Sequence, residues 1–173
     1  MRLVVLVLLV AASSPAKAQT PPAWRIGTGV ALAAADGFAY AGGTAAIERY
    51  ASRRLWVGVR AARSVGPLAD VDCFDLCPRI EQRWTSAEGT VSAEAVSGGM
   101  ALHATVGAGG SVMVGANGLT REDRRVVPML SAGLGLDVYP VRRVGVGVRV
   151  DAVARSLAPG AQVSAGLRVR LGG

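Results

Sequence analysis

Apolar and polar residues alternate with a period of two along most of this chain, and no helical periodicity competes with that pattern. The alternation is clearest near the carboxyl terminus, where Val163, Leu167 and Val169 have one parity and Ser164 and Arg168 have the other. Successive side chains of a strand point to opposite faces of a sheet. The chain is therefore expected to be all-β, with one apolar and one mixed face.

The alternation also explains how the chain can be highly hydrophobic without containing a membrane helix. The chain is 51% hydrophobic with a mean hydropathy of +0.38, yet after residue 18 it offers no run of 18 apolar residues that would form a membrane helix. Tilted strands of about 9–11 residues cross a bilayer with only every second residue apolar. The predicted strands are 23–36, 37–50, 54–65, 79–96, 99–114, 124–138, 142–157 and 161–171.

The amino terminus has the three parts of a secretory signal peptide. Arg2 supplies a positive charge, residues 3–12 form a ten-residue apolar run, and Ala16-Lys17-Ala18 supplies small residues around a cleavage site. We expect a signal peptide over 1–18 and a single β-barrel domain over 19–173. The 155-residue mature chain would contain 17 arginines, no lysine and 12 acidic residues, for a net charge of +5.

The connections between the predicted strands differ at the two ends. Short turns at 50–54, 96–99 and 139–143 all fall on the side of the two termini, whereas longer links at 66–79 and 115–124 fall on the other side. Transmembrane barrels have short periplasmic turns and longer extracellular loops. An even number of strands also allows the sheet to close without a free edge. The expected fold is an eight-stranded antiparallel up-and-down transmembrane β-barrel.

The mixed face decides which side of the sheet is inside. It intersperses charges of both signs with glycine and serine, which suits a crowded lumen where arginines pair with carboxylates. A soluble barrel of lipocalin type, with its apolar face inside, is the alternative. The predicted lumen charges are Arg25, Arg60, Glu88, Glu94, Asp137, Arg149, Asp151, Arg168 and Arg170.

The segment Val127–Val150 combines an inward strand of glycine and aspartate, a turn with tyrosine and two arginines, and a returning strand with alternating valines. With the signal peptide and the eight strands, it resembles the small outer-membrane barrels of the OmpA transmembrane-domain, OmpX and OmpW type. The resemblance implies location in the bacterial outer membrane and assembly by the barrel-insertion machinery. Such barrels usually end in an aromatic residue, whereas this chain ends in Leu171-Gly172-Gly173.

Aromatic residues are few. We expect them to form thin girdles, with one group near the rim of the short turns and another near the opposite rim. The first group is Trp24, Tyr50, Trp56 and Tyr139, and the second is Phe38, Tyr40 and Trp84.

The longest predicted loop contains Cys73 and Cys77, which in an exported protein are expected to form a local disulfide. A redox-active pair is the alternative, but no lysine or histidine lies nearby to activate a thiol. Asp70, Asp72 and Asp75 surround the cysteines. Their spacing does not match an EF-hand loop, so a solvated acidic loop is expected and no metal site is predicted.

The single histidine, His103, lies on the lumen side of its strand near Ser92 and Glu94. A His–Ser–Glu arrangement is the chemistry of a lipid-modifying hydrolase. Attack on an acyl chain needs a membrane-facing site, however, so we expect a hydrogen-bonded lumen histidine instead. No enzyme activity and no cofactor are predicted.

The arginines are scattered over turns, lumen and loops, and no basic stripe interleaved with aromatic residues points to nucleic acid. Arginines of the segment 120–125 suit the phosphates of lipopolysaccharide, and the outer-membrane lipid is the other expected partner. The sequence thus favours a non-enzymatic outer-membrane barrel that serves envelope integrity or surface interaction through loops 66–79 and 115–124. The alternatives are an OmpW-like channel for small apolar solutes and a soluble lipocalin-like carrier.

Overall fold

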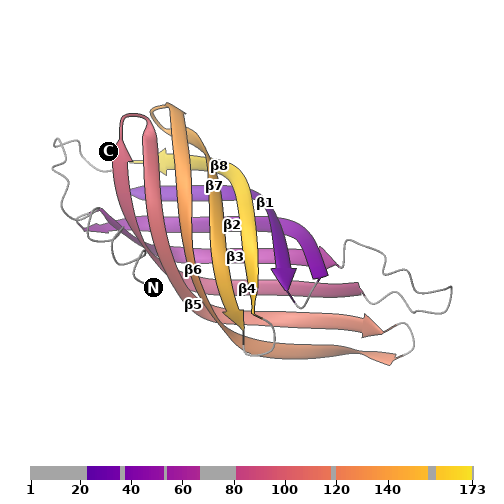
Figure 1. Cartoon of the computed structure of the whole chain (residues 1–173). Coiled ribbons are helices and arrows are strands. Elements are labelled where there is room, and N and C mark those ends of the chain that lie inside the picture. The colour runs from indigo at the N-terminus through magenta and orange to yellow at the C-terminus, as the bar shows by residue number, and fades with distance from the viewer. Residues whose placement is uncertain are drawn as a thin grey trace.

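The described residues form a closed barrel of eight antiparallel strands, in which each strand pairs with the next and the last pairs with the first (Figure 1). This computed structural model describes residues 23–35, 38–52, 54–66, 81–117, 120–155 and 159–172. The predicted all-β, eight-stranded up-and-down fold is confirmed. The strands are β1 (Trp24–Ala35), β2 (Phe38–Ser52), β3 (Leu55–Gly66), β4 (Glu81–Ser97), β5 (Met100–Asn117), β6 (Thr120–Val141), β7 (Val144–Arg155) and β8 (Gly160–Leu171).

Closure is complete along the first strand. Every residue of β1 has a partner on both sides, so that Trp24 lies opposite Arg49 on β2 and opposite Leu171 on β8. A closed ladder satisfies the backbone N–H and C=O groups within the sheet, which in lipid is required because each unpaired group would cost several kcal/mol. The wall of this barrel therefore needs no water to satisfy its backbone.

The two ends of the barrel differ, and we name them the turn end and the loop end. The turn end holds the start of β1, the end of β8 and tight turns after β2, β4 and β6. One of these turns places Arg54 at φ 73°, an unfavourable conformation for a residue with a side chain. The turn is held by two hydrogen bonds, from Arg54 N to Tyr50 Oη (3.3 Å) and from Glu94 N to Arg54 O (3.0 Å).

The hairpin of β5 and β6 is longer than predicted (Figure 1). At the loop end β4 accompanies β5 as far as Glu81 opposite Ala116, whereas β7 stops at Arg155 opposite Met129. The expected loop 115–124 is wrong, because pairing continues to Asn117 opposite Thr120. The charged run in this segment suggested a loop, but beyond the membrane-facing part of a hairpin polar residues are compatible with strand pairing. Among the described strands, β6 before Met129 pairs with β5 alone.

The barrel is apolar outside and polar inside. Val126 and Val30 on the outer face are 77% and 70% exposed, whereas Ser92 and Asp137 in the lumen are fully buried. A soluble barrel has the opposite distribution, so the lipocalin-like alternative is contradicted. No helix in the described part of the chain is long and apolar enough to span a membrane.

The predicted aromatic girdles are largely wrong. Tyr40, Trp56 and Trp84 are buried, because they share the parity of the lumen residues on their strands, and Tyr50 and Tyr139 are half-buried on that same parity. Trp24, at 42% exposure, is the one aromatic side chain that the structure describes as exposed on the outer face. The Phe38 side chain lies outside the described residues.

The outer face yields a test of the membrane environment at Val150, in the middle of β7 opposite Leu134 and Val163. We expect Val150→Arg to lower the free energy of unfolding from lipid vesicles by about 2–4 kcal/mol, because a guanidinium near the bilayer midplane loses its hydration. Val141→Arg, at the turn end, is the matched control and should cost about 0–1 kcal/mol. Equal stability of both variants, measured by urea titration, would contradict a membrane-facing wall.

Candidate functional site

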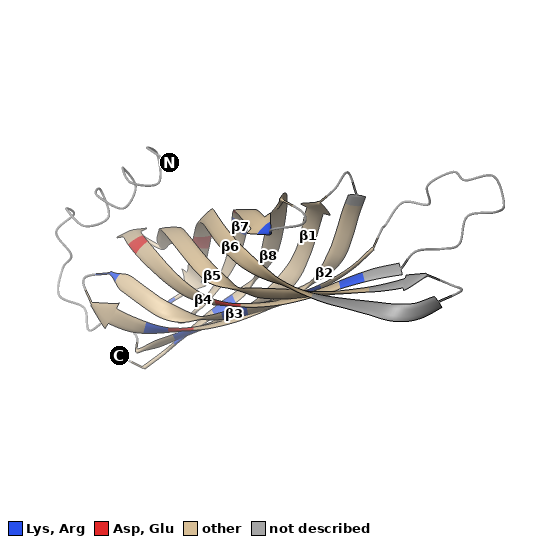
Figure 2. Ribbon diagram, turned by 90° about the horizontal axis from the view of Figure 1, so that it is seen from below, with Lys and Arg blue, Asp and Glu red and all other residues tan. Residues whose placement is uncertain are grey.

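Five arginines and five carboxylates form a charge network in the described part of the lumen, and their formal charges balance when the histidine is neutral. Arg155 shares the lumen parity of its strand but lies apart from this network, toward the loop end. The charged positions come from strands all around the barrel rather than from one stretch of chain (Figure 2). The nine residues predicted from the sequence all have their side chains on the lumen side, and the structure adds Glu48 on β2. The set is Arg25, Arg60, Arg149, Arg168, Arg170, Glu48, Glu88, Glu94, Asp137 and Asp151.

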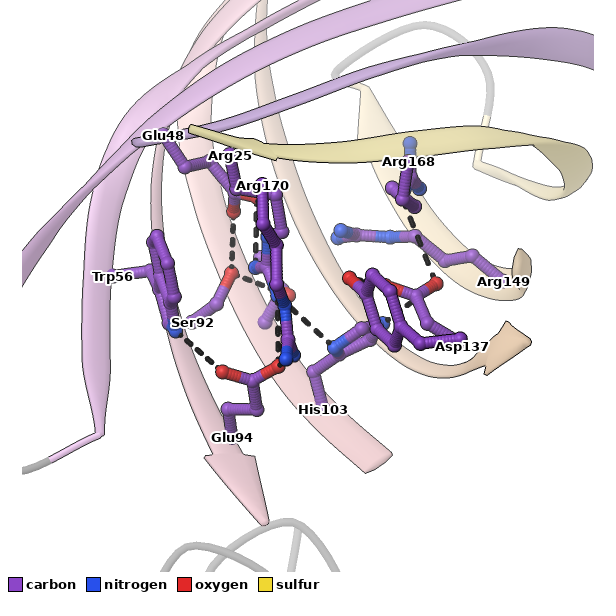
Figure 3. Close-up of polar contacts among 12 residues, drawn as sticks. Arg25, Glu48, Trp56, Ser92, Glu94, His103, Asp137, Arg149, Arg168 and Arg170 are labelled. Carbon is purple, nitrogen blue, oxygen red and sulfur yellow. Dashed lines mark hydrogen bonds and ion pairs between the residues drawn. The ribbon is translucent and has the colours of Figure 1, made fainter. Parts of the chain in front are cut away.

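Arg25 is the centre of a cluster near the turn end (Figure 3). Its guanidinium donates to Glu48 Oε2 at 2.7 Å, and its Nη1 lies 3.4 Å from Glu94 Oε1 and 3.3 Å from His103 Nδ1. The guanidinium carbon also lies 4.7 Å from the centre of the Trp56 ring, within range of a cation–π interaction. One arginine on β1 thus joins side chains from β2, β3, β4 and β5.

Glu94 is the acceptor that ties this cluster to the opposite wall. Trp56 Nε1 donates to Glu94 Oε2 at 2.7 Å, and Arg170 on β8 donates to Glu94 Oε1. The Arg170 guanidinium lies 3.9 Å from the centre of the Tyr139 ring. The inward-facing aromatic side chains therefore contact the charged residues of this cluster, and these contacts account for their position inside the barrel.

His103 lies between Arg25 and Asp137. A guanidinium has no acceptor, so His103 Nδ1 must accept from Arg25, and the ring hydrogen is on Nε2, 3.3 Å from Asp137 Oδ1. Arg168 Nε lies 3.6 Å from the same Asp137 oxygen, and Tyr139 Oη donates to Asp137 Oδ2 at 3.2 Å. The histidine ring thus lies between a guanidinium on β1 and a carboxylate on β6.

The arrangement around Ser92 does not supply a nucleophile–base pair. Ser92 Oγ donates to Glu48 Oε1 at 2.9 Å and lies 2.8 Å from Thr105 Oγ1. His103 contacts Arg25 and Asp137 instead, and both residues are buried in the lumen, away from the acyl chains that a lipid-modifying enzyme would attack.

A second cluster lies nearer the loop end, around Arg60. Its guanidinium binds Glu88, reaches Asp151 Oδ2 at 2.8 Å and Ser131 Oγ at 3.2 Å, and Ser131 in turn donates to Glu88 Oε2 at 2.6 Å. Arg149 Nε donates to both oxygens of Asp151, at 2.8 and 2.9 Å. Two arginines and two carboxylates thus neutralise one another across the lumen.

Glycines make room for these side chains. Gly147 lies directly opposite Asp137, and Gly133 lies directly opposite Asp151. A Cβ at Gly147 would lie 1.9 Å from Asp137 Oδ1, and a Cβ at Gly133 would lie 2.1 Å from Asp151 Oδ1. The glycine-rich inner face is therefore a requirement of the charged clusters, because any larger residue at these positions would displace a carboxylate.

Beyond the Arg60 cluster, apolar side chains close the lumen toward the loop end. Ala35, Tyr40, Trp84 and Val127 form a buried cluster, and the Arg155 guanidinium lies 4.8 Å from the centre of the Trp84 ring. The cavity beside Arg60, Glu88 and Ser131 has a volume of about 10 Å³, room for roughly one water molecule. Beside the Arg60 cluster, the lumen therefore leaves little free space between its side chains.

The remaining sequence predictions fall elsewhere. Cys73 and Cys77, with the acidic residues around them, lie outside the described residues. Within the described ranges, no group of three histidine, cysteine, aspartate or glutamate side chains is arranged to hold a metal ion. Glu48 was missed because alanine and glycine occupy both faces of its strand, and because Tyr40 and Tyr50, which share its parity, were expected to face lipid.

An apolar exterior around a lumen of paired charges defines the class of transmembrane β-barrels, and comparison with solved structures gives the same result. The Neisserial surface protein A is similar to this chain with a TM-score of 0.68 at 12% identity, over 86% of this chain and 97% of that one. Ail, the attachment invasion locus protein of Yersinia pestis, matches with a TM-score of 0.65 at 13% identity, over 88% and 100%. A second Ail structure, in complex with the heparin analogue sucrose octasulfate, matches with a TM-score of 0.59 at 14% identity, over 86% and 96%.

These similarities establish the fold, which is that of the small eight-stranded outer-membrane barrels. No protein-family model matches the chain, and no curated protein matches its sequence. What the protein does must therefore be argued from its own residues.

The glycine requirement is testable at Gly147. We expect Gly147→Ala to lower the free energy of unfolding by about 1–3 kcal/mol, since the new methyl group would force Asp137 away from His103 and Tyr139. Gly89→Ala is the matched control, because its Cβ would face the outside with the nearest atom, Ala108 O, at 3.9 Å. Its effect should stay within about 0.5 kcal/mol. A smaller loss for Gly147→Ala than for the control would refute the role assigned to this glycine.

Arg60 tests the ionic cluster directly. Arg60→Met leaves Glu88 without its arginine in a buried site, and we expect the free energy of unfolding to fall by about 3–5 kcal/mol. Arg63→Met makes the same substitution on the same strand but on the outer face, where loss of the charge should change stability by less than about 1 kcal/mol. Urea unfolding in vesicles compares the two, and equal midpoints would show that Glu88 does not depend on Arg60.

Proposed function

We propose that this chain is a non-enzymatic protein of the bacterial outer membrane, exported by a signal peptide over 1–18 and inserted as a barrel over 19–173 by the barrel-insertion machinery. The turn end faces the periplasm and the loop end faces outward. The apolar outer face supports the membrane location, and the likeness to three outer-membrane barrel structures supports the choice of membrane. Residues 1–18 lie outside the described part of the chain.

The ion pairs that cross the lumen are the observation that supports a role other than transport. A channel for small apolar solutes needs a continuous path lined by apolar side chains. Here the turn-end half of the lumen is crossed by the ion pairs of Arg25, the middle is crossed by those of Arg60, and the cluster around Trp84 covers them toward the loop end. The interior of the barrel is a structural plug, and function is assigned to the surfaces at its ends.

Surface interaction is assigned to the loop end, where the β5–β6 hairpin extends past the end of β7. Its segment 120–125 contains three arginines and two acidic residues. Guanidinium groups bind phosphate and sulfate through paired hydrogen bonds, so the proposed partners are anionic sugars, with lipopolysaccharide as the partner in the same membrane. The complex of Ail with a sulfated sugar analogue offers a parallel in a barrel of the same fold.

A hairpin variant tests this proposal. We expect replacement of Arg121, Arg124 and Arg125 by glutamine to weaken binding of the refolded barrel to purified lipopolysaccharide and to immobilised heparin by roughly tenfold or more, because each arginine near an anionic surface contributes about 1 kcal/mol. Replacement of Arg142 and Arg143, at the turn end, is the control and should leave both affinities unchanged. Undiminished binding by the hairpin variant would exclude the assigned surface.

Two further experiments test the membrane location and the closure of the lumen. The protein should fractionate with outer membranes and migrate differently in gels before and after heating, since a closed barrel resists detergent until it is boiled. In planar bilayers we expect no single-channel conductance from the wild-type protein. Discrete openings that change in Arg149→Ala would instead indicate a pore, and recovery of the protein wholly in the soluble periplasm would refute the location.

A further inference from the structure

Charge is segregated between the two faces of the barrel. Each carboxylate whose side chain the structure describes, namely Glu48, Glu88, Glu94, Asp137 and Asp151, is buried in the lumen. The outer face and the turns instead expose arginines, among them Arg49, Arg63, Arg142 and Arg143. Anions that neutralise the outer arginines must therefore come from outside the described part of the chain.

Arg49 has the most defined surroundings of this group. It lies on the outer face of β2, directly opposite Trp24 on β1 and Val57 on β3, which are 42% and 47% exposed. Ile47, two residues along the same strand, is 46% exposed. The outer arginine is thus flanked by apolar side chains at the edge of the lipid-facing surface.

Two further features make this position a site rather than an isolated charge. The Arg49 guanidinium carbon lies 5.7 Å from the centre of the Trp24 ring, so the indole holds the cation at the surface. A shallow groove, lined by Arg49, Tyr50, Ala51 and Val57, opens beside it. The groove combines the Arg49 guanidinium with the apolar side chains of Ala51 and Val57, which matches the boundary between a lipid headgroup and its acyl chains.

We propose that Arg49 and Trp24 form a binding site for the phosphate of an anionic glycerophospholipid in the leaflet at the turn end. This inference rests on the proposed membrane location. The guanidinium binds the phosphate oxygens, as the planar fork of arginine does in other phosphate sites. Trp24 and Val57 contact the upper part of the acyl chain. The site takes the place of the aromatic girdle, because the other predicted members at this end, Tyr50, Trp56 and Tyr139, turn inward.

Trp24 is a built-in probe for the lipid next to Arg49. The refolded protein is placed in phosphatidylcholine vesicles that contain a small share of phosphatidylglycerol. In one sample the phosphatidylglycerol carries bromine on its acyl chains, and in the other an equal amount of the phosphatidylcholine does. Bromine quenches tryptophan fluorescence only at close range. The Trp24→Phe variant gives the signal of Trp56 and Trp84, which is subtracted to leave the signal of Trp24.

We expect brominated phosphatidylglycerol to occupy the position beside Trp24 about fivefold more readily than an equal amount of brominated phosphatidylcholine. Arg49→Gln should reduce this preference to near one, and Arg49→Lys should keep part of it because the charge remains. Arg63→Gln is the matched control. It removes the same charge from the same face near the loop end and should leave the quenching of Trp24 unchanged.

Three other results would each overturn a different statement. Equal quenching by the two lipids in the wild type, or an undiminished preference in Arg49→Gln, would exclude the lipid site while leaving the membrane location intact. A preference lost equally in Arg63→Gln would mean that the whole face, rather than Arg49, attracts anionic lipid. Absence of quenching by every brominated lipid, in protein that migrates as a folded barrel, would instead refute the lipid-facing wall and with it the proposed function.

Discussion

The structure depends on charge neutrality in a space that holds no bulk water. Closure at eight strands leaves an interior only wide enough for side chains, so each charge placed there must meet an opposite one. An unpaired charge in such an interior is strongly destabilising. Five arginines and five carboxylates meet this condition through contacts that cross the lumen, such as the one from Arg60 on β3 to Asp151 on β7. The pairs hold opposite walls together as well as neutralising one another.

Filling the lumen with long arginines and short carboxylates also determines where the chain needs glycine. An arginine that crosses the barrel needs an acceptor on the far wall. A carboxylate fits there only if the residue directly opposite it on the neighbouring strand has no Cβ. Gly147 and Gly133 meet this need opposite Asp137 and Asp151. Much of the high glycine content is thus explained by cross-strand space within the lumen rather than by turns.

Many of the strands and lumen charges could be predicted from the sequence, because the face to which a strand residue points depends only on its position along that strand. Alternation alone gave all eight strands, and it assigned one parity to nine charged residues whose side chains the structure directs to the lumen. It failed where both faces of a strand carry small residues, as around Glu48 on β2. It also failed at the rims, where aromatic residues were assigned to lipid although Trp56 shares its parity with Arg60. Which arginine meets which carboxylate was beyond prediction, since those contacts depend on the tilt and closure of the whole barrel.

Charge segregation connects the interior to the membrane. The mature chain would have 17 arginines and 12 acidic residues, and the balanced lumen takes five of each, so the entire surplus of five positive charges lies outside that set. An arginine placed in the lumen without a new acid would break neutrality, whereas on the outer surface it meets lipid phosphates or water. Additional positive charge is therefore favoured at the rims, turns and loops, and the further lumen-side arginine, Arg155, lies toward the loop end against the Trp84 ring. The same constraint that fills the lumen thus directs excess arginine to the surfaces where the barrel meets the headgroups of its membrane.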